Sequence, residues 1–192
     1  MPPKAKFLKD EIVQAALDIV RIDGFSALTA RSLGEKLGSS ARPIFTVFKS
    51  MEDVQCAVIA AAKARYGEYV ERGLSEPLPF KGVGMQYILF AVNEPKLFQL
   101  LFMSEQAQVP NLSGILPLID ESYEKILSSI RLSYNLDDLH AQRLYQHLWI
   151  YTHGIAALCA TKTCGFTGEE ISEMLTEVFV SILKKIKEER ND

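Results

Sequence analysis

Residues 29–48 read TARSLGEKLGSSARPIFTVF, and this stretch decides how the N-terminal part of the chain is expected to fold. Thr29 is a favourable N-cap for a short helix, because its hydroxyl can accept a hydrogen bond from a backbone N–H of the first turn. Leu33 and Leu37, four residues apart, supply the buried side of this helix. Gly38 ends the helix, since glycine readily adopts the left-handed conformation found after helices.

A second short helix is expected directly after the turn. Ser40 caps it, Ala41 begins it, and Pro43 lies in its first turn, where a missing N–H costs little. Ile44 and Phe48 are again four apart and face inward. The pattern is that of a helix-turn-helix, whose second helix enters the major groove of DNA. Two packed short helices are also common as plain structure, so the spacing alone leaves both interpretations open.

The solvent face of the second helix would present small and mid-sized side chains to base edges: Ala41, Arg42, Pro43, Phe45 and Thr46. Arg42 suits guanine O6 and N7, whereas Ala41 or Pro43 suits a thymine methyl. Phosphates would be held by Thr29, Arg31, Ser40 and Lys49. The lysines of the N-terminal arm would add positive charge, namely Lys4, Lys6 and Lys9.

Charge is unevenly distributed along the chain, whose net charge is −3. Residues 1–50 hold eight Lys and Arg against five Asp and Glu, a net of +3, and residues 51–192 hold thirteen against nineteen, a net of −6. A small DNA-binding head on a larger acidic body has this distribution. Chance is the alternative explanation, because an excess of three charges is modest.

The rest of the chain shows the periodicity of helices and does not show the alternation of strands. One apolar stripe precedes the quoted stretch: Ile12, Ala15, Ala16, Ile19 and Val20. Further helices are expected over residues 51–73, 80–92, 95–104, 115–134, 137–163 and 169–189. These ranges predict an all-α fold of nine helices. A three-helix helix-turn-helix head, residues 1–50, would precede a larger helical domain, residues 51–192.

Composition and motifs exclude several classes of protein. The chain is 48% hydrophobic and 23% charged, as in soluble globular proteins, and no run reaches the roughly 18 apolar residues of a membrane span. Three cysteines and no recognisable signal peptide predict a cytoplasmic protein without a disulfide framework. There is no nucleophile elbow, phosphate loop or dinucleotide fingerprint, so neither an enzyme nor a cofactor is expected.

Metal and redox sites are also not expected. His140, His147 and His153 lie seven and six residues apart, whereas zinc ligands on a helix prefer a spacing of four. Cys159 and Cys164 are interpreted as structural.

Several motifs resemble the DNA-binding head of the TetR family of bacterial transcriptional regulators. In the family's order they are Ile12-x-x-Ala15-Ala16, Gly24-Phe25, TARSLG from Thr29, LGSS from Leu37 and PIFTVFKSME from Pro43. Two segments of the larger domain, WIYTHGIA at 149–156 and EPKLFQLLF at 94–102, resemble ligand-domain segments of one group in that family. The chain departs from the family at Phe45, Val47 and Met51, where tyrosine, histidine and lysine are usual.

The resemblance implies a repressor that binds a palindromic operator as a homodimer and is released by a small apolar effector. It implies a ligand cavity in the larger domain, with the candidates Tyr87, Phe102, Trp149 and His153. The alanine-rich helix from Met51 would couple the cavity to the head. The alternatives are a helical-bundle carrier or enzyme without DNA binding, and a TetR-like protein that has lost operator binding.

The last two helices are expected to form the dimer. Small residues on one and an apolar stripe on the other would pack as a four-helix bundle across a two-fold axis: Gly154, Ala157, Leu175, Val178, Phe179 and Ile182. The alternative is that these side chains pack only onto the chain's own core.

Overall fold

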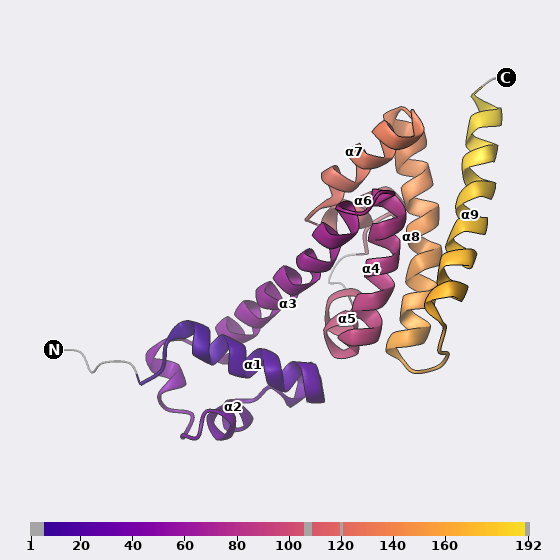
Figure 1. Cartoon of the computed structure of the whole chain (residues 1–192). Helices are drawn as coiled ribbons and strands as arrows, with labels where there is room; N and C mark the ends of the chain where they lie inside the picture. Colours follow the sequence, from indigo (N-terminus) through magenta and orange to yellow (C-terminus); the bar gives the residue numbers. More distant parts are fainter. Residues whose placement is uncertain (1–5, 106–108, 120, 191–192) are drawn as a thin grey trace. The chain divides into compact units, whose positions relative to one another are not determined.

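The computed structural model describes residues 6–105, 109–119 and 121–190, so Lys4 lies outside the described residues. Within them the chain forms nine α-helices and two single-turn 3-10 helices, and no strand (Figure 1). The α-helices are α1 (Lys9–Asp23), α2 (Ala30–Lys36), α3 (Met51–Leu74), α4 (Pro79–Asn93), α5 (Pro95–Phe102), α6 (Leu112–Ile119), α7 (Tyr123–Tyr134), α8 (Asp138–Ala160) and α9 (Gly168–Glu189). The 3-10 helices are η1 (Phe25–Ala27) and η2 (Ile44–Thr46). The all-α prediction is confirmed.

The nine α-helices are not the nine that were predicted. The helix expected to begin at Ala41 is absent, and this stretch forms turns around η2. Pro43 gives a physical reason, because a proline disfavours the α conformation of the residue before it, here Arg42. A helix starting at Ala41 would therefore be broken at its first turn.

The single helix expected over 115–134 is two helices, α6 and α7. Pro117 lies inside α6 and has no N–H to donate, and α6 ends two residues later. The helix expected over 137–163 ends earlier, at Ala160, because Lys162 adopts a left-handed φ of 57°. These changes move helix ends but leave the all-α class intact.

The chain divides into two compact units. The first unit comprises the described residues of 1–65 together with 94–104, and the second comprises those of 66–93 and 105–192. The core of the first unit is formed by fully buried apolar side chains of α1, α2, η2 and α5: Ile12, Ala16, Val20, Leu33, Ile44, Leu97 and Phe98. The division falls inside α3 and again where α4 gives way to α5.

A buried carboxylate lies at the start of α5 in the first unit. Arg21, in the last turn of α1, donates two hydrogen bonds of 2.7 Å to the two oxygens of Glu94. The Nε of Arg65 lies 3.6 Å from the same carboxylate. The Glu94 side chain is only 4% exposed and that of Arg21 is 40% exposed, so a charge pair with a buried carboxylate and a partly exposed guanidinium holds the start of α5 to α1.

We predict that Glu94→Gln destabilises the first unit by about 1–3 kcal/mol, because Arg21 loses a charged acceptor and a neutral amide remains buried in its place. The measurement is a urea unfolding curve. Glu35→Gln is the control, since Glu35 pairs with Arg31 on the surface, and it should leave the midpoint almost unchanged. Equal effects of the two substitutions would contradict the structural role of Glu94.

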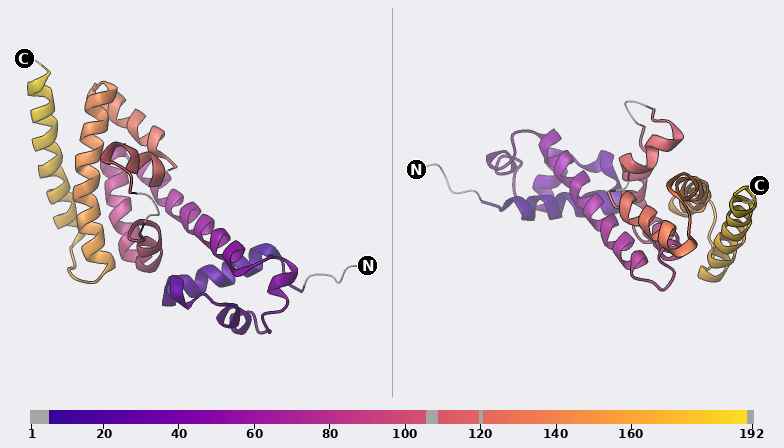
Figure 2. Two further views of the ribbon diagram at one scale, coloured as in Figure 1. Left: turned by 180° about the vertical axis from the view of Figure 1, so that it is seen from behind. Right: turned by 90° about the horizontal axis from the view of Figure 1, so that it is seen from above.

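The second unit is a helical bundle in which α4, α8 and α9 lie side by side, with α7 against α8 (Figure 2). Its core includes Phe90 of α4, whose ring lies 5.4 Å from that of Tyr66 and 5.2 Å from that of Tyr69 at the end of α3. Other fully buried side chains complete it: Ile126, Ile130 and Leu144. Aromatic residues therefore join α3 to the bundle.

Two glycines let α3 and α4 approach closely. A Cβ added at Gly73 would lie 2.6 Å from the backbone nitrogen of Val83, and one added at Gly82 would meet the carbonyl oxygen of Gly73. No L-residue side chain fits there without moving the backbone. This crossing fixes the first turn of α4, including Lys81.

We predict that Gly73→Ala lowers the free energy of unfolding by about 1–3 kcal/mol, because a methyl group must force the two helices apart. Gly67→Ala on the same helix is the matched control. A Cβ there meets nothing within 4 Å, so this substitution should be neutral or stabilise the helix by up to about 1 kcal/mol. Thermal unfolding of both variants tests the prediction, which an unchanged Gly73→Ala melting temperature would contradict.

Candidate functional site

The first unit presents a set of exposed polar and basic side chains around η2. Ile44 is fully buried and Phe48 is 6% exposed, as predicted, and together they anchor the segment to the core. Between and beside them, Arg42, Thr46 and Lys49 are exposed, and the ring of Phe45 is 43% exposed. The segment is therefore held from within while its predicted DNA-contacting side chains face water.

Arg42 makes no hydrogen bond or ion pair with any described residue, and its charge is therefore available to a partner. The side chain of Arg31 is 90% exposed and pairs with Glu35 through Nε at 3.0 Å. Lys6 donates to the hydroxyl of Ser39 at 3.0 Å, so the positive charge of Lys6 lies at the turn after α2.

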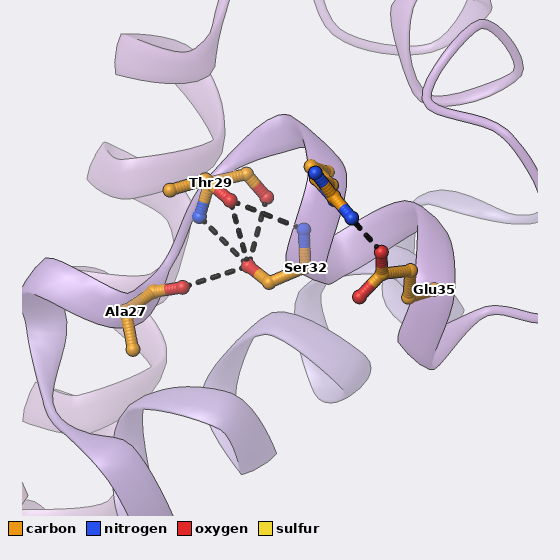
Figure 3. A network of polar contacts seen from close by, with 5 residues as sticks. Ala27, Thr29, Ser32 and Glu35 are labelled. Atoms are coloured by element: carbon orange, nitrogen blue, oxygen red, sulfur yellow. Dashed lines mark hydrogen bonds and ion pairs between the residues drawn. The ribbon is translucent and has the colours of Figure 1, made fainter.

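Thr29 caps α2 through a reciprocal pair of hydrogen bonds (Figure 3). The backbone N–H of Ser32 donates to Oγ1 of Thr29 at 3.1 Å, and the backbone N–H of Thr29 donates to Oγ of Ser32 at 3.0 Å. The Ser32 hydroxyl also donates to the carbonyl oxygen of Ala27 at 2.7 Å. The predicted N-cap is confirmed, and a phosphate would share the Thr29 hydroxyl with the cap.

The turn after α2 packs tightly on the helix it follows. Gly38 adopts a φ of +61°, which L-residues rarely take. A Cβ added at Gly34 would lie 3.0 Å from backbone atoms of Ser39 and Ala41. Ser40 is exposed, while Ala41 and Pro43 are half-buried. This close packing holds the turn in place without a second α-helix.

The second unit contains a cavity of about 220 Å³. Its walls come from α4, α8 and α9, with contributions from the end of α3 and of α7. Aromatic and aliphatic side chains dominate the lining, which includes Tyr66, Phe80, Lys81, Tyr87, Tyr134, Tyr145, Leu148, Trp149, Thr152, Leu175, Thr176 and Phe179. A mostly apolar hollow with a few polar groups is typical of small-molecule sites.

Two of the four predicted ligand residues, Tyr87 and Trp149, line this cavity. His153 lies behind them: its Nδ1 is 2.9 Å from the Tyr87 hydroxyl, and its ring stacks on Trp149 with centroids 5.2 Å apart. Burial lowers the pKa of His153, so the neutral ring is the favoured partner of the phenol. Phe102 belongs to the first unit, where its ring packs against Phe98 at 5.2 Å.

Three residues that line the cavity were not predicted as ligand residues: Lys81, Tyr134 and Tyr145. The helical spacing of these residues matches ordinary packing, and only the folded chain brings α4, α7 and α8 around one space. Burial raises the pKa of Tyr134, whose ring lies 4.9 Å from that of Phe179. The aromatic composition of the second unit was the one available signal.

The predicted dimer residues fall into two groups. Leu175 is buried in the bundle and lines the cavity, as does Phe179, whose ring lies 6.4 Å from that of Phe80. Gly154 is exposed, and the remaining three are half-buried: Ala157, Val178 and Ile182. The same face of α8 as Gly154 also exposes two larger apolar side chains, Ile150 and Leu158.

Other site types find no support in the described part of the chain. It holds no group of three His, Cys, Asp or Glu side chains arranged to bind a metal ion. None of its helices has the length and apolar character needed to cross a membrane. Comparison with protein-family models and with curated proteins found no match to this chain.

Proposed function

We propose that this protein is a ligand-responsive transcriptional regulator of the TetR type: a repressor that binds a palindromic operator as a homodimer and is released by a small effector. The observation that carries the proposal is the division of charge between the two compact units. The first unit has eleven Lys and Arg against eight Asp and Glu, a net of +3. The second has ten against sixteen, a net of −6, and it contains the cavity.

The DNA-binding part of the proposal rests on the exposed residues around η2. DNA attracts local positive charge even on a protein that is acidic overall. Arg42 and Lys49 carry such charge on a segment anchored by buried Ile44. Contacts to base edges carry sequence preference whereas contacts to phosphates fix position, and the exposed Arg42 and Lys49 suit these two roles.

We predict that Arg42→Ala weakens operator binding by about 1–3 kcal/mol and relaxes the preference at one base pair, because a bidentate contact to guanine is lost. The measurement is a binding-site selection from random duplexes, carried out with the wild-type protein and with the Arg42→Ala variant. Lys185→Ala is the control, because Lys185 is an exposed side chain on α9 of the second unit, and this variant should select the wild-type sequence. Identical selected sequences for all three proteins would remove the base-reading role of Arg42.

A two-fold dimer is part of the proposal, because a palindromic operator needs two heads related by such an axis. The exposed face of α8 supports this part. Ile150 is 49% exposed and lies one helical turn from Gly154, where an added Cβ meets nothing within 4 Å. A small residue flanked by apolar ones allows another helix to approach closely.

We predict that Ile150→Glu yields a folded monomer with greatly reduced operator affinity, because a charge would be buried between subunits. Sedimentation and circular dichroism measure assembly and folding together. Leu132→Glu on α7 is the control, since Leu132 is 85% exposed outside this face, and it should remain dimeric. An Ile150→Glu variant that stays dimeric would place the interface elsewhere.

The absence of an α-helix at Ala41 favours a second candidate, a helical-bundle carrier of small molecules without DNA binding. Both candidates use the cavity of the second unit, so ligand binding does not separate them. The binding-site selection with random duplexes separates the two candidates. A protein that binds small molecules but enriches no duplex sequence would be such a carrier.

A further inference from the structure

One charged side chain lies among the residues that line the cavity. Lys81, in the first turn of α4, is half-buried, and none of the described Asp or Glu residues lines the cavity with it. Glu76 lines a shallow surface groove beside Lys81, but Lys81 makes no ion pair with any described residue. Among the described lining residues, the cavity therefore has one positively charged side chain and no negatively charged one to balance it.

The ammonium group of Lys81 is held toward α9. Its Nζ donates to Oγ1 of Thr176 at 3.1 Å, and the Thr176 hydroxyl in turn donates to the carbonyl oxygen of Ser172 at 2.6 Å. An ammonium has three donors, and this contact uses one of them. The other two donors make no hydrogen bond with a described residue, and Lys81 is one of the residues that line the cavity.

The rest of the lining accepts an apolar body. Four tyrosines, Phe80, Phe179 and Trp149 contribute ring surface. The volume of about 220 Å³ exceeds that of a roughly 150 Å³ apolar cavity that is large enough to bind benzene. A single aromatic or alicyclic ring with a short chain matches this space and surface.

We infer that the effector is a small amphipathic anion whose apolar ring fills the cavity and whose carboxylate pairs with Lys81. This inference rests on the proposed function and names the chemical class of its ligand. In partly apolar surroundings an ammonium–carboxylate pair is stronger than in water. A cationic ligand would be repelled by Lys81, and a neutral one would leave the ammonium without a charged partner.

Trp149 makes the inference testable without labelling, because it is the chain's single tryptophan and it lines the cavity. The probes are 4-phenylbutyrate and 4-phenylbutanol, which share one apolar body and differ in charge. Each is titrated into the full-length protein while tryptophan fluorescence is recorded. We expect the acid to bind at least about tenfold more tightly than the alcohol, since hydrogen bonds to charged groups are the stronger ones.

Lys81→Met removes the charge and keeps most of the aliphatic length. It should weaken binding of the acid about tenfold, leave binding of the alcohol nearly unchanged, and so abolish the preference. Lys185→Met on α9, whose side chain does not line the cavity, should keep the wild-type preference. The comparison of acid and alcohol on the wild-type protein needs no variant and holds even if Lys81→Met does not fold.

The outcomes separate this inference from the proposed function. If acid and alcohol bind the wild type equally, the cavity remains a ligand site and the preference for an anion is wrong. If Lys81→Met keeps the full preference for the acid, the anion is held elsewhere and the assignment to Lys81 is wrong. If neither probe changes Trp149 fluorescence at millimolar concentration, the inference fails, whereas the DNA-binding half of the proposed function is still judged by duplex selection.

Discussion

The buried carboxylate of Glu94 is the constraint on which the packing of the first unit depends. A carboxylate with 4% exposure needs a cationic partner, and Arg21 supplies one with two hydrogen bonds of 2.7 Å. Glu94 also follows Asn93, the last residue of α4, which is a wall of the cavity. The chain therefore passes directly from a cavity helix to the charge pair that holds α1.

Under the proposed function, this connection offers a route from ligand to DNA. A ligand that prefers one position of α4 acts on the residue that follows it, and Glu94 holds α1 of the DNA-binding unit. Ligand and operator then influence each other only to the extent that each prefers a different arrangement of these helices. The chain passes between the two units a second time within α3, where the division falls after Arg65. The route through Glu94 is therefore additional to the one through α3.

Sequence patterns predicted most of this fold because amphipathic helices record their buried faces in the spacing of apolar residues. Ile12, Leu33 and Ile44 were expected inside and are fully buried. The pattern failed between residues 41 and 48, where four-residue spacing suggested a helix and Pro43 opposed it. The spacing of apolar residues reports which side of a segment is buried. Over so short a stretch, a 3-10 turn can bury the same apolar side chains as an α-helix.

The candidate sites were less predictable than the helices. Tyr87 and Trp149 were identified through a family resemblance and line the cavity, but Lys81 was not, because nothing in its own segment distinguishes it from a surface lysine. Its role depends on Thr176, 95 residues later in the chain, and on the absence of Asp and Glu among the described residues that line the cavity. The sequence alone does not show that these residues lie together in the folded chain.

The central claim is that an acidic chain binds DNA through the local positive charge of its first unit. The most direct test is the dependence of duplex affinity on salt, measured by fluorescence anisotropy with a selected duplex between 50 and 200 mM salt. If a dimer neutralises on the order of six phosphates, log K falls with log salt at a slope near −5. A slope near zero would contradict the claim, because binding would then release no counterions from DNA.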